Sequence, residues 1–172
     1  YKAFSWRFWT LLDNGGEIGV VLPRGALINA GSEDFRREIL NNGVVNDITL
    51  VRNKSNWVFD DAEERYTIAL LGVKKSPPDA ETKVPLRGPY IDEESFEQGI
   101  EQGPYLFPVE EAESWTGSAS FPMLPSDPRS IEVFKQMSSL PRLGIDEENQ
   151  WRAVPHRELD SSADREKDDG TT

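Results

Sequence analysis

The residues that most often carry out catalysis or bind metals are scarce in this sequence. It contains no cysteine, which removes disulfides and thiolate metal ligands, and a single histidine, His156. Short acidic runs recur instead, at positions 60–61, 63–64, 92–94 and 110–111. Carboxylates could ligate a metal or exchange protons, but no motif makes these runs converge, so we interpret them as solvated surface charges. The sequence therefore predicts neither a catalytic residue nor a metal site in this chain.

Two patterns could bind phosphate. Gly15, Gly16 and Gly19 superficially form a phosphate loop, but such a loop follows a strand and opens a helix, whereas these glycines precede a strand-like run. Arg36 and Arg37 could also contact phosphate, although their place on a predicted helix favours an exposed helix surface. We therefore reject the glycine pattern as a phosphate site and expect the arginines on the surface.

The acidic balance of the chain argues against non-specific binding to nucleic acid. The 172 residues include 31 acidic and 19 basic side chains, for a net charge of -12, whereas phosphate contacts need clustered lysine and arginine. A solvated acidic surface explains this charge, and adaptation to a salty cytoplasm is a second explanation. No stretch approaches the ~20 apolar residues of a membrane span, and no basic leader precedes an apolar segment. We expect a soluble, cytoplasmic protein.

The stretch that must position any site is a short apolar run at residues 18–23. The Gly15-Gly16 turn comes directly before it, and Pro23 ends it. An unbroken apolar run of this length is typical of a buried parallel strand. The carboxyl end of such a strand is where an open α/β sheet holds a ligand.

The segment before this turn has the spacing of an apolar helix. Phe4, Phe8, Leu11 and Leu12 recur at i, i+4, i+7 and i+8 and predict its core face, while two tryptophans point elsewhere. A helix that is apolar around much of its circumference needs cover on two sides. We therefore expect part of that cover to be absent from this chain, and the lack of an N-terminal cap predicts a fragment.

The next elements complete half of a doubly wound sheet. Ser32 is a suitable N-cap for a helix whose core pair is Phe35 and Ile39. Residues 44–51 and 66–73 then predict two strands. Helix, strand, helix, strand and strand, joined by short turns, is the second half of such a sheet.

Residues 76–160 have a weaker pattern, and the charged, polar residues 161–172 are expected to be disordered. The elements expected there are a linker at 76–82, a short helix at 93–100, a strand at 105–109, and a helix capped by Asp127 and begun by Pro128 that presents Ile131, Phe134 and Met137 on one face.

One series of motifs spans residues 1–75. It consists of Tyr1-Lys2-Ala3-Phe4, the Gly15-Gly16 turn, a strand that ends at Pro23, Phe35-Arg36-Arg37 on a helix, and Asn56-Trp57-Val58-Phe59 before the last strand. This series resembles the later motifs of gamma-class adenine-N6 DNA methyltransferases, most closely the large methylase subunits and the fused restriction-modification enzymes of type IIG. A weaker match, at 121–125, 131–137 and 151–165, is similar to the spacer that leads such enzymes into their target-recognition region.

The resemblance implies a Rossmann-like class I methyltransferase fold whose final strand, at 66–73, inserts antiparallel beside the preceding ones. It implies methyl transfer from S-adenosylmethionine to the N6 of an adenine flipped out of double-stranded DNA. Phe59 then stacks on the target base, and Phe4 packs against the cofactor. For both phenylalanines the alternative is packing in the core, and Trp57 competes with Phe59 for the stacking role.

The sequence departs from this family in one respect. The Gly-rich cofactor turn and the Asn-Pro-Pro-Tyr or Asn-Pro-Pro-Phe tetrapeptide that holds the target amine are both absent. The resemblance therefore implies the carboxyl-terminal half of a methylase domain at 1–75, a spacer at 76–160 and a tail at 161–172, inactive without the missing N-terminal half. A non-catalytic scaffold or interaction subunit with a Rossmann-like half fold is the alternative. A different nucleotide-binding α/β enzyme is a third, disfavoured by the lack of a phosphate motif.

Overall fold

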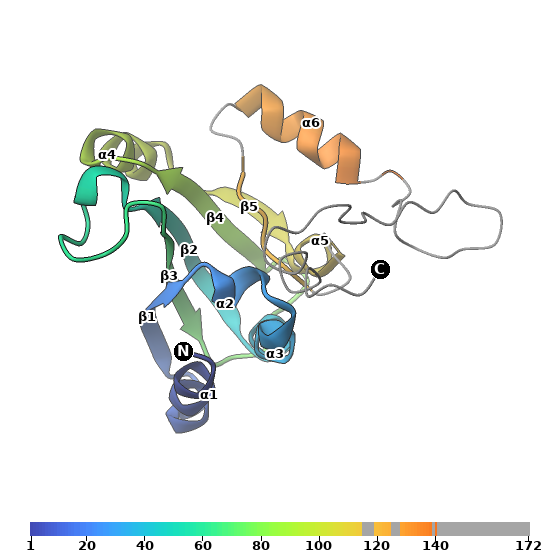
Figure 1. Ribbon diagram of the computed structural model, residues 1–172. Coiled ribbons are helices and arrows are strands. Elements are labelled where there is room, and N and C mark those ends of the chain that lie inside the picture. Colours follow the sequence, from blue (N-terminus) through green and yellow to red (C-terminus); the bar gives the residue numbers. More distant parts are fainter. Residues whose placement is uncertain (115–118, 125–127, 139, 141–172) are drawn as a thin grey trace, which may run out of the picture. The chain divides into compact units, whose positions relative to one another are not determined.

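The computed structural model describes residues 1–114, 119–124, 128–138 and 140. Tyr1–Phe134 form one compact unit, and Lys135–Thr172 form a second. The first unit is built on one mixed sheet of five strands in the order β1-β3-β2-β4-β5 (Figure 1). Helices and strands are interspersed along the chain, so the fold is mixed α/β.

The bounds of the elements are as follows. The strands are β1 Glu17–Pro23, β2 Val44–Arg52, β3 Thr67–Lys74, β4 Lys83–Tyr90 and β5 Tyr105–Pro108. The helices are α1 Lys2–Leu11, α2 Gly25–Ile28, α3 Glu33–Asn41, α4 Glu93–Gln102, α5 Val109–Ser114 and α6 Pro128–Ser138, with short 3₁₀ turns at Ala30–Ser32 and Lys54–Asn56.

Strand β3 lies between β1 and β2 and runs antiparallel to both. Leu71 pairs with Val20 on one side and with Ile48 on the other. The predicted antiparallel insertion of this strand is thereby confirmed. Leu71 and Ile48 are fully buried, so the centre of this three-strand unit lies in the core.

Strand β1 differs from the prediction of a buried parallel strand. It is the edge strand of the described sheet, and its one strand neighbour, β3, is antiparallel. Burial alternates along it, with Leu22 buried and Val21 56% exposed. An apolar run cannot by itself distinguish a strand covered on both faces from an edge strand with one covered face.

Helices α1 and α3 pack on the same face of β1 and β3. Side chains of both helices, Trp9 from α1 and Ile39 from α3 among them, meet Val20 and Leu71 around one small cavity. The buried side of α1 is formed by Ser5 and Trp9. The indole nitrogen of Trp9 also donates a hydrogen bond to Glu38 Oε1 at 3.0 Å.

The predicted core face of α1 is therefore wrong for this chain. Phe4, Phe8 and Leu11 are 66%, 38% and 63% exposed. When a helix carries apolar residues around most of its circumference, spacing identifies the apolar sides but not the side that meets the sheet.

The sheet continues past residue 75 through β4, which the sequence did not predict. β4 pairs parallel with β2, and β5 pairs antiparallel with β4. Val84 and Leu86 of β4 are buried, although Pro85, Gly88 and Pro89 weaken the strand pattern. The predicted helix at 93–100 and strand at 105–109 correspond to α4 and β5. The role of residues 76–160 as a spacer stays a prediction.

Some predictions concern residues outside the described ones. These are the disordered tail at 161–172, the N-cap Asp127, His156 and the spacer match at 151–165. The helix expected after Asp127 is present as α6, and Ile131 on it is buried. Among the described residues, no helix is both long and apolar enough to span a membrane.

Candidate functional site

A pocket of about 580 Å³ lies beyond the carboxyl end of β1, and we call it the Phe59 pocket. Strand β1 supplies one wall, and the segment that leads into β3 supplies the other. Its lining residues are Val21, Leu22, Pro23, Arg24, Gly25, Phe59, Ala62, Arg65, Tyr66, Thr67 and Ile68. Backbone hydrogen bonding joins the two walls, because the amide of Arg24 donates to the carbonyl of Thr67 at 3.0 Å.

The chemistry of this pocket is that of binding. It combines apolar walls with the ring of Phe59, which is 42% exposed. Arg24 and Arg65 add two cations, while no carboxylate, imidazole or thiol is among the lining side chains. Such a lining suits a planar, partly anionic ligand, and the phenol of Tyr66 is the lining group best suited to exchange a proton.

The two arginines of the pocket have different surroundings. Arg65 is largely exposed, and its Nε lies 2.9 Å from Glu63 Oε1. The Nε of Arg24 is buried and has no hydrogen-bond partner among the described residues. The guanidinium of Arg65 is therefore the more accessible of the two cations.

Phe59 is presented by the segment at residues 53–66, which we call the 53–66 loop. Its first residue, Asn53, is fully buried, and the amide nitrogen of its side chain donates to the carbonyls of Phe59 and Ala62, each at 2.9 Å. Its side-chain oxygen accepts from the amides of Val58 at 3.2 Å and Phe59 at 3.0 Å. The sequence predicted only a turn here, and the preference of asparagine for turns is the one signal of this role.

Trp57, the predicted competitor of Phe59, lies elsewhere in the same loop. It is not among the residues that line the pocket. Its indole nitrogen donates to the carbonyl of Arg52 at 2.7 Å, and its ring centroid lies 6.0 Å from that of Phe96 on α4. The ring of Phe96 makes an edge contact with Tyr90 at 5.6 Å. Trp57 therefore supports the loop from the side of α4, while Phe59 faces the pocket.

Phe4, the predicted cofactor residue, is not brought together with Phe59. It lies on α1, and its ring is stacked on Phe8 with centroids 6.4 Å apart. It does not line the Phe59 pocket. Its 66% exposure makes it a surface residue of this chain, available to a neighbouring segment.

Arg36 corrects the expectation of an exposed or phosphate-binding arginine. It is completely buried, and it donates to the carbonyls of Ala26, Asn29 and Ala119 at 3.1, 2.9 and 2.9 Å. A longer contact of 3.4 Å reaches Ser120 Oγ. Burial lowers the pKa of the Arg36 guanidinium from its ordinary value. Its role is to join helix α2 to the segment at 119–120.

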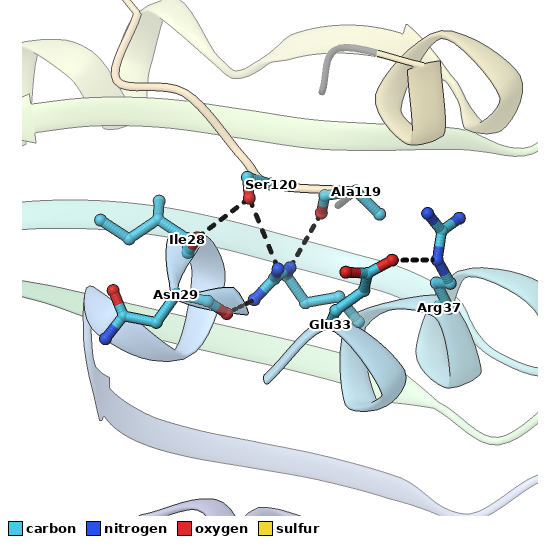
Figure 2. A network of polar contacts seen from close by, with 7 residues as sticks. Ile28, Asn29, Glu33, Arg37, Ala119 and Ser120 are labelled. Atoms are coloured by element: carbon cyan, nitrogen blue, oxygen red, sulfur yellow. Dashed lines mark hydrogen bonds and ion pairs between the residues drawn. The ribbon is translucent and has the colours of Figure 1, made fainter. Parts of the chain in front are cut away.

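Figure 2 shows this network of polar contacts, with Asn29, Ala119 and Ser120 labelled. Ser120 Oγ also donates to the carbonyl of Ile28 at 3.0 Å. Arg37, by contrast, forms an ion pair with Glu33 at 2.9 Å, one helical turn earlier on the partly exposed side of α3. The two adjacent arginines therefore have opposite surroundings, which the sequence alone did not distinguish.

A second cavity, of about 620 Å³, lies between the end of β4, helix α4 and the start of β5. Arg87 and Tyr90 line it, and the Nε of Arg87 lies 3.3 Å from a carboxylate oxygen of Asp47. Burial raises the pKa of the Tyr90 phenol above its ordinary value. The predictions included no site here.

No family model and no curated protein matches this sequence. One solved chain of similar fold comes from a study of complex assembly and conformational transition of the type I restriction-modification system. The match has a TM-score of 0.53 and 16% identity, and it covers 79% of this chain and 35% of that chain. Another is a modification subunit of a putative type I restriction enzyme from Vibrio vulnificus YJ016, with a TM-score of 0.46, 21% identity, and coverage of 72% and 29%. This chain thus shares the fold of a part of the first protein and spans about a third of its length.

Proposed function

We propose that this chain is the carboxyl-terminal part of the methylase region of a site-specific DNA methyltransferase in a restriction-modification system. The reaction is transfer of a methyl group from S-adenosylmethionine to the N6 of an adenine flipped out of double-stranded DNA. The fold shared with a type I restriction-modification chain supports this proposal, as do the motifs of residues 1–75. In this proposal the proton chemistry belongs to other parts of the complete protein, and this chain contributes binding and positioning.

The observation that carries the proposal is the placement of Phe59. An extruded base loses its stacking partners, and an aromatic face replaces them, worth ~1 to 3 kcal/mol per base. Phe59 is 42% exposed, lines a pocket at the carboxyl end of β1, and belongs to a loop whose backbone is hydrogen-bonded to a buried asparagine. A phenylalanine that merely filled the core would be buried.

The contribution of this chain to the cofactor site is one wall. Phe4 has an exposed ring that can pack against the adenine of S-adenosylmethionine, but it lines none of the described cavities named above. The remaining walls belong to the N-terminal half of the domain. We therefore predict that the 172-residue chain alone binds S-adenosylmethionine more weakly than ~100 μM, equivalent to less than ~5 kcal/mol of binding free energy. Calorimetry that detected tighter one-site binding would contradict this division of the site.

Within the restriction-modification class, we favour the type IIG arrangement that the sequence motifs resemble. The solved chain of similar fold comes from a type I system. A nuclease domain on the same polypeptide is the feature that separates the type IIG arrangement from the type I arrangement. The proposed partner is double-stranded DNA, and residues 76–160 act as the spacer toward a target-recognition region. Because this chain is strongly acidic, the basic surface that holds phosphates belongs to other parts of the complete protein.

A non-catalytic scaffold subunit is the second candidate, and one observation favours it. Val21 on the open edge of β1 and Phe4 on α1 are both exposed apolar residues that another chain could cover. The two candidates differ in the gene sequence before Tyr1. An Asn-Pro-Pro-aromatic tetrapeptide within a few tens of codons supports the methyltransferase, while an unrelated domain supports the scaffold.

The direct test replaces Phe59 in the full-length protein. Phe59→Leu keeps the apolar bulk but removes the aromatic face, so we expect methylation to fall by about one to two powers of ten. Phe59→Trp keeps a stacking face and retains most of the rate. Cofactor affinity and thermal stability, measured on the same samples, are expected to change little. Equal rates in the leucine and tryptophan variants would contradict the stacking role.

A further inference from the structure

The most completely bonded side chain near the Phe59 pocket is that of Asn53. A primary amide has two donor hydrogens and two acceptor lone pairs. The Asn53 oxygen accepts from two backbone amides, those of Val58 and Phe59, at 3.2 and 3.0 Å. Its nitrogen donates to the carbonyls of Phe59 and Ala62, with a longer contact of 3.3 Å to Asn56 Oδ1. Because Asn53 is 0% exposed, no water competes for these bonds.

These bonds fix both backbone polar groups of Phe59. The backbone N–H and the backbone C=O of Phe59 are each bound by the same side chain, at 3.0 and 2.9 Å. Fixing both groups restricts the backbone dihedrals of Phe59 and therefore the direction in which its ring leaves the backbone. The ring of Phe59 is thus directed by Asn53 through the backbone of Phe59.

Asn53 is in turn fixed to the sheet. Asn53 follows directly after β2, whose residue Val51 is buried. The backbone amide of Asn53 donates to the carbonyl of Tyr66 at 3.0 Å. The 53–66 loop is therefore closed at its base. The loop between these points is irregular, since Ser55 and Asn56 have positive φ angles of 55° and 56°, which residues other than glycine adopt at a cost. A loop of this kind keeps one conformation only where its surroundings impose it.

We propose that Asn53 is the positioning residue that orients Phe59 for stacking on the extruded adenine, an inference that rests on the function proposed above. Asparagine suits this role because its side chain offers donors and acceptors in one plane. Aspartate keeps the acceptors but has no amide donor for the carbonyls of Phe59 and Ala62, while alanine removes both. Positioning matters because a displacement of about 1 Å can cost about a hundredfold in rate.

The first test measures the loop itself, by amide hydrogen exchange in the full-length protein. Asn53→Ala should speed exchange across residues 54–62 by about tenfold or more, because the amides of Val58 and Phe59 lose their acceptor. The matched control is Thr49→Val, which removes a partly buried hydrogen bond to Asp47 from the same strand, β2, outside the loop. This control should leave loop exchange unchanged. Unchanged loop exchange in Asn53→Ala, or an equal increase in the control, overturns the proposal.

The second test asks whether Asn53 acts through Phe59. In the full-length protein, Asn53→Ala should lower the methylation rate at saturating DNA by about ten- to a hundredfold, with a small change in KM for S-adenosylmethionine. The double variant Asn53→Ala with Phe59→Leu should be no slower than Phe59→Leu alone, because the group being oriented is already absent. A double variant whose loss equals the product of the two single losses would assign Asn53 a separate role and overturn the proposal.

A fluorescent base analogue at the target position separates this inference from the function on which it rests. Its emission rises when the base leaves the stack, so Asn53→Ala should change that signal, while Thr49→Val should not. If Phe59→Leu methylates normally, the proposed function fails, and the catalytic role of Asn53 fails with it. If Phe59→Leu is impaired while Asn53→Ala is as active as the parent, only the inference about Asn53 fails.

Discussion

Arg36 and Asn53 are both polar, both completely buried, and both bound mainly to backbone groups, yet they hold different parts of the molecule. Arg36 contacts Ala119, which lies 83 residues away in the sequence. The hydrogen bonds of the Asn53 side chain stay within nine residues, inside the 53–66 loop. The first residue therefore joins distant elements, and the second shapes one loop.

This difference separates stability from function. A contact between distant segments forms only when the whole unit folds, so its loss lowers the stability of the whole unit. A contact within one loop can be lost while the sheet remains folded, so its loss changes the surface that the loop presents. Variants at Arg36 should therefore mainly lower stability, whereas variants at Asn53 should mainly lower methylation.

The largest effect on stability is expected for Arg36→Ala. This change removes the guanidinium that donates to the carbonyls of Ala26, Asn29 and Ala119 and opens a cavity, so the free energy of unfolding should fall by about 3 to 5 kcal/mol. The Asn29 carbonyl keeps the amide of Ser32 as a donor. Chemical denaturation measures the change. A loss below about 1 kcal/mol would show that these carbonyls find other partners. Methylation per folded molecule of the full-length protein should stay near that of the parent.

A smaller loss of stability is expected for Asn53→Ala, about 1 to 3 kcal/mol, because the carbonyls of the loop can reach water once it opens. The same denaturation series applies, and its result is compared with that of Arg36→Ala. If Asn53→Ala were the more destabilising of the two, the contrast between a long-range and a local contact would be wrong.

Ser120→Ala tests how much the Ser120 hydroxyl contributes to the Arg36 network. The hydroxyl donates to the carbonyl of Ile28 at 3.0 Å and accepts a 3.4 Å contact from Arg36. Its removal should cost about 1 kcal/mol of unfolding free energy. A double-mutant cycle with Arg36→Ala should show coupling of at least about 0.5 kcal/mol, whereas additive losses would indicate that the two residues act independently.

The contact between the 53–66 loop and α4 is expected to contribute less to the free energy of unfolding than the hydrogen bonds of Asn53. Phe96→Leu removes the aromatic pairs of Phe96 with Trp57 and Tyr90 and should cost about 0.5 to 1.5 kcal/mol beyond the loss of buried area. Hydrogen exchange of the 53–66 loop should change less than in Asn53→Ala. Equal exchange in the two variants would mean that α4, rather than Asn53, orders the loop.

The smallest expected effect is the dependence of stability on the ionisation of Asp92. The hydrogen bond from Ser95 lowers the pKa of the Asp92 carboxyl at the N-terminus of α4. A lowered folded pKa means that this stabilisation is complete above the ordinary carboxyl value, about 3.9, and is lost as the pH falls through the folded value. Ser95→Ala should move the pKa of Asp92 back toward its ordinary range in a carboxyl titration followed by NMR. An unchanged pKa would contradict a contribution from the Ser95 hydroxyl and leave the lowering to the backbone amide of Ser95, 2.8 Å from Asp92 Oδ1.

The sequence predicted those features of the fold that depend on local pattern. Apart from the short helix α2, which the sequence did not predict, the order of helices and strands up to residue 75 follows from apolar runs separated by turn residues. The resemblance added the antiparallel place of the strand at 66–73. Strand β4 was missed because its prolines and its glycine weaken the local signal, while pairing with β2 outweighs it. Pairing with a distant strand is not visible in a local pattern.

The buried polar residues were missed for a related reason. The sequence indicated a helix surface position for Arg36, because its acceptors on residues 119 and 120 come from a distant part of the chain and are not visible locally. The sequence indicated only a turn residue at Asn53, because the turn preference of asparagine does not predict which backbone groups its side-chain amide binds. Phe59, in contrast, was found through the motif that surrounds it, and its role in stacking remains a prediction.

The measurement that tests the central proposal most directly is a base-resolved analysis of methylation in DNA exposed to the full-length protein and S-adenosylmethionine. The proposal predicts N6-methyladenine at one short recognition sequence, and about one to two powers of ten less of it, under matched initial-rate conditions, with Phe59→Leu. No methylated adenine with the parent protein, methylation of another base, or an equal yield from the Phe59→Leu variant would contradict it.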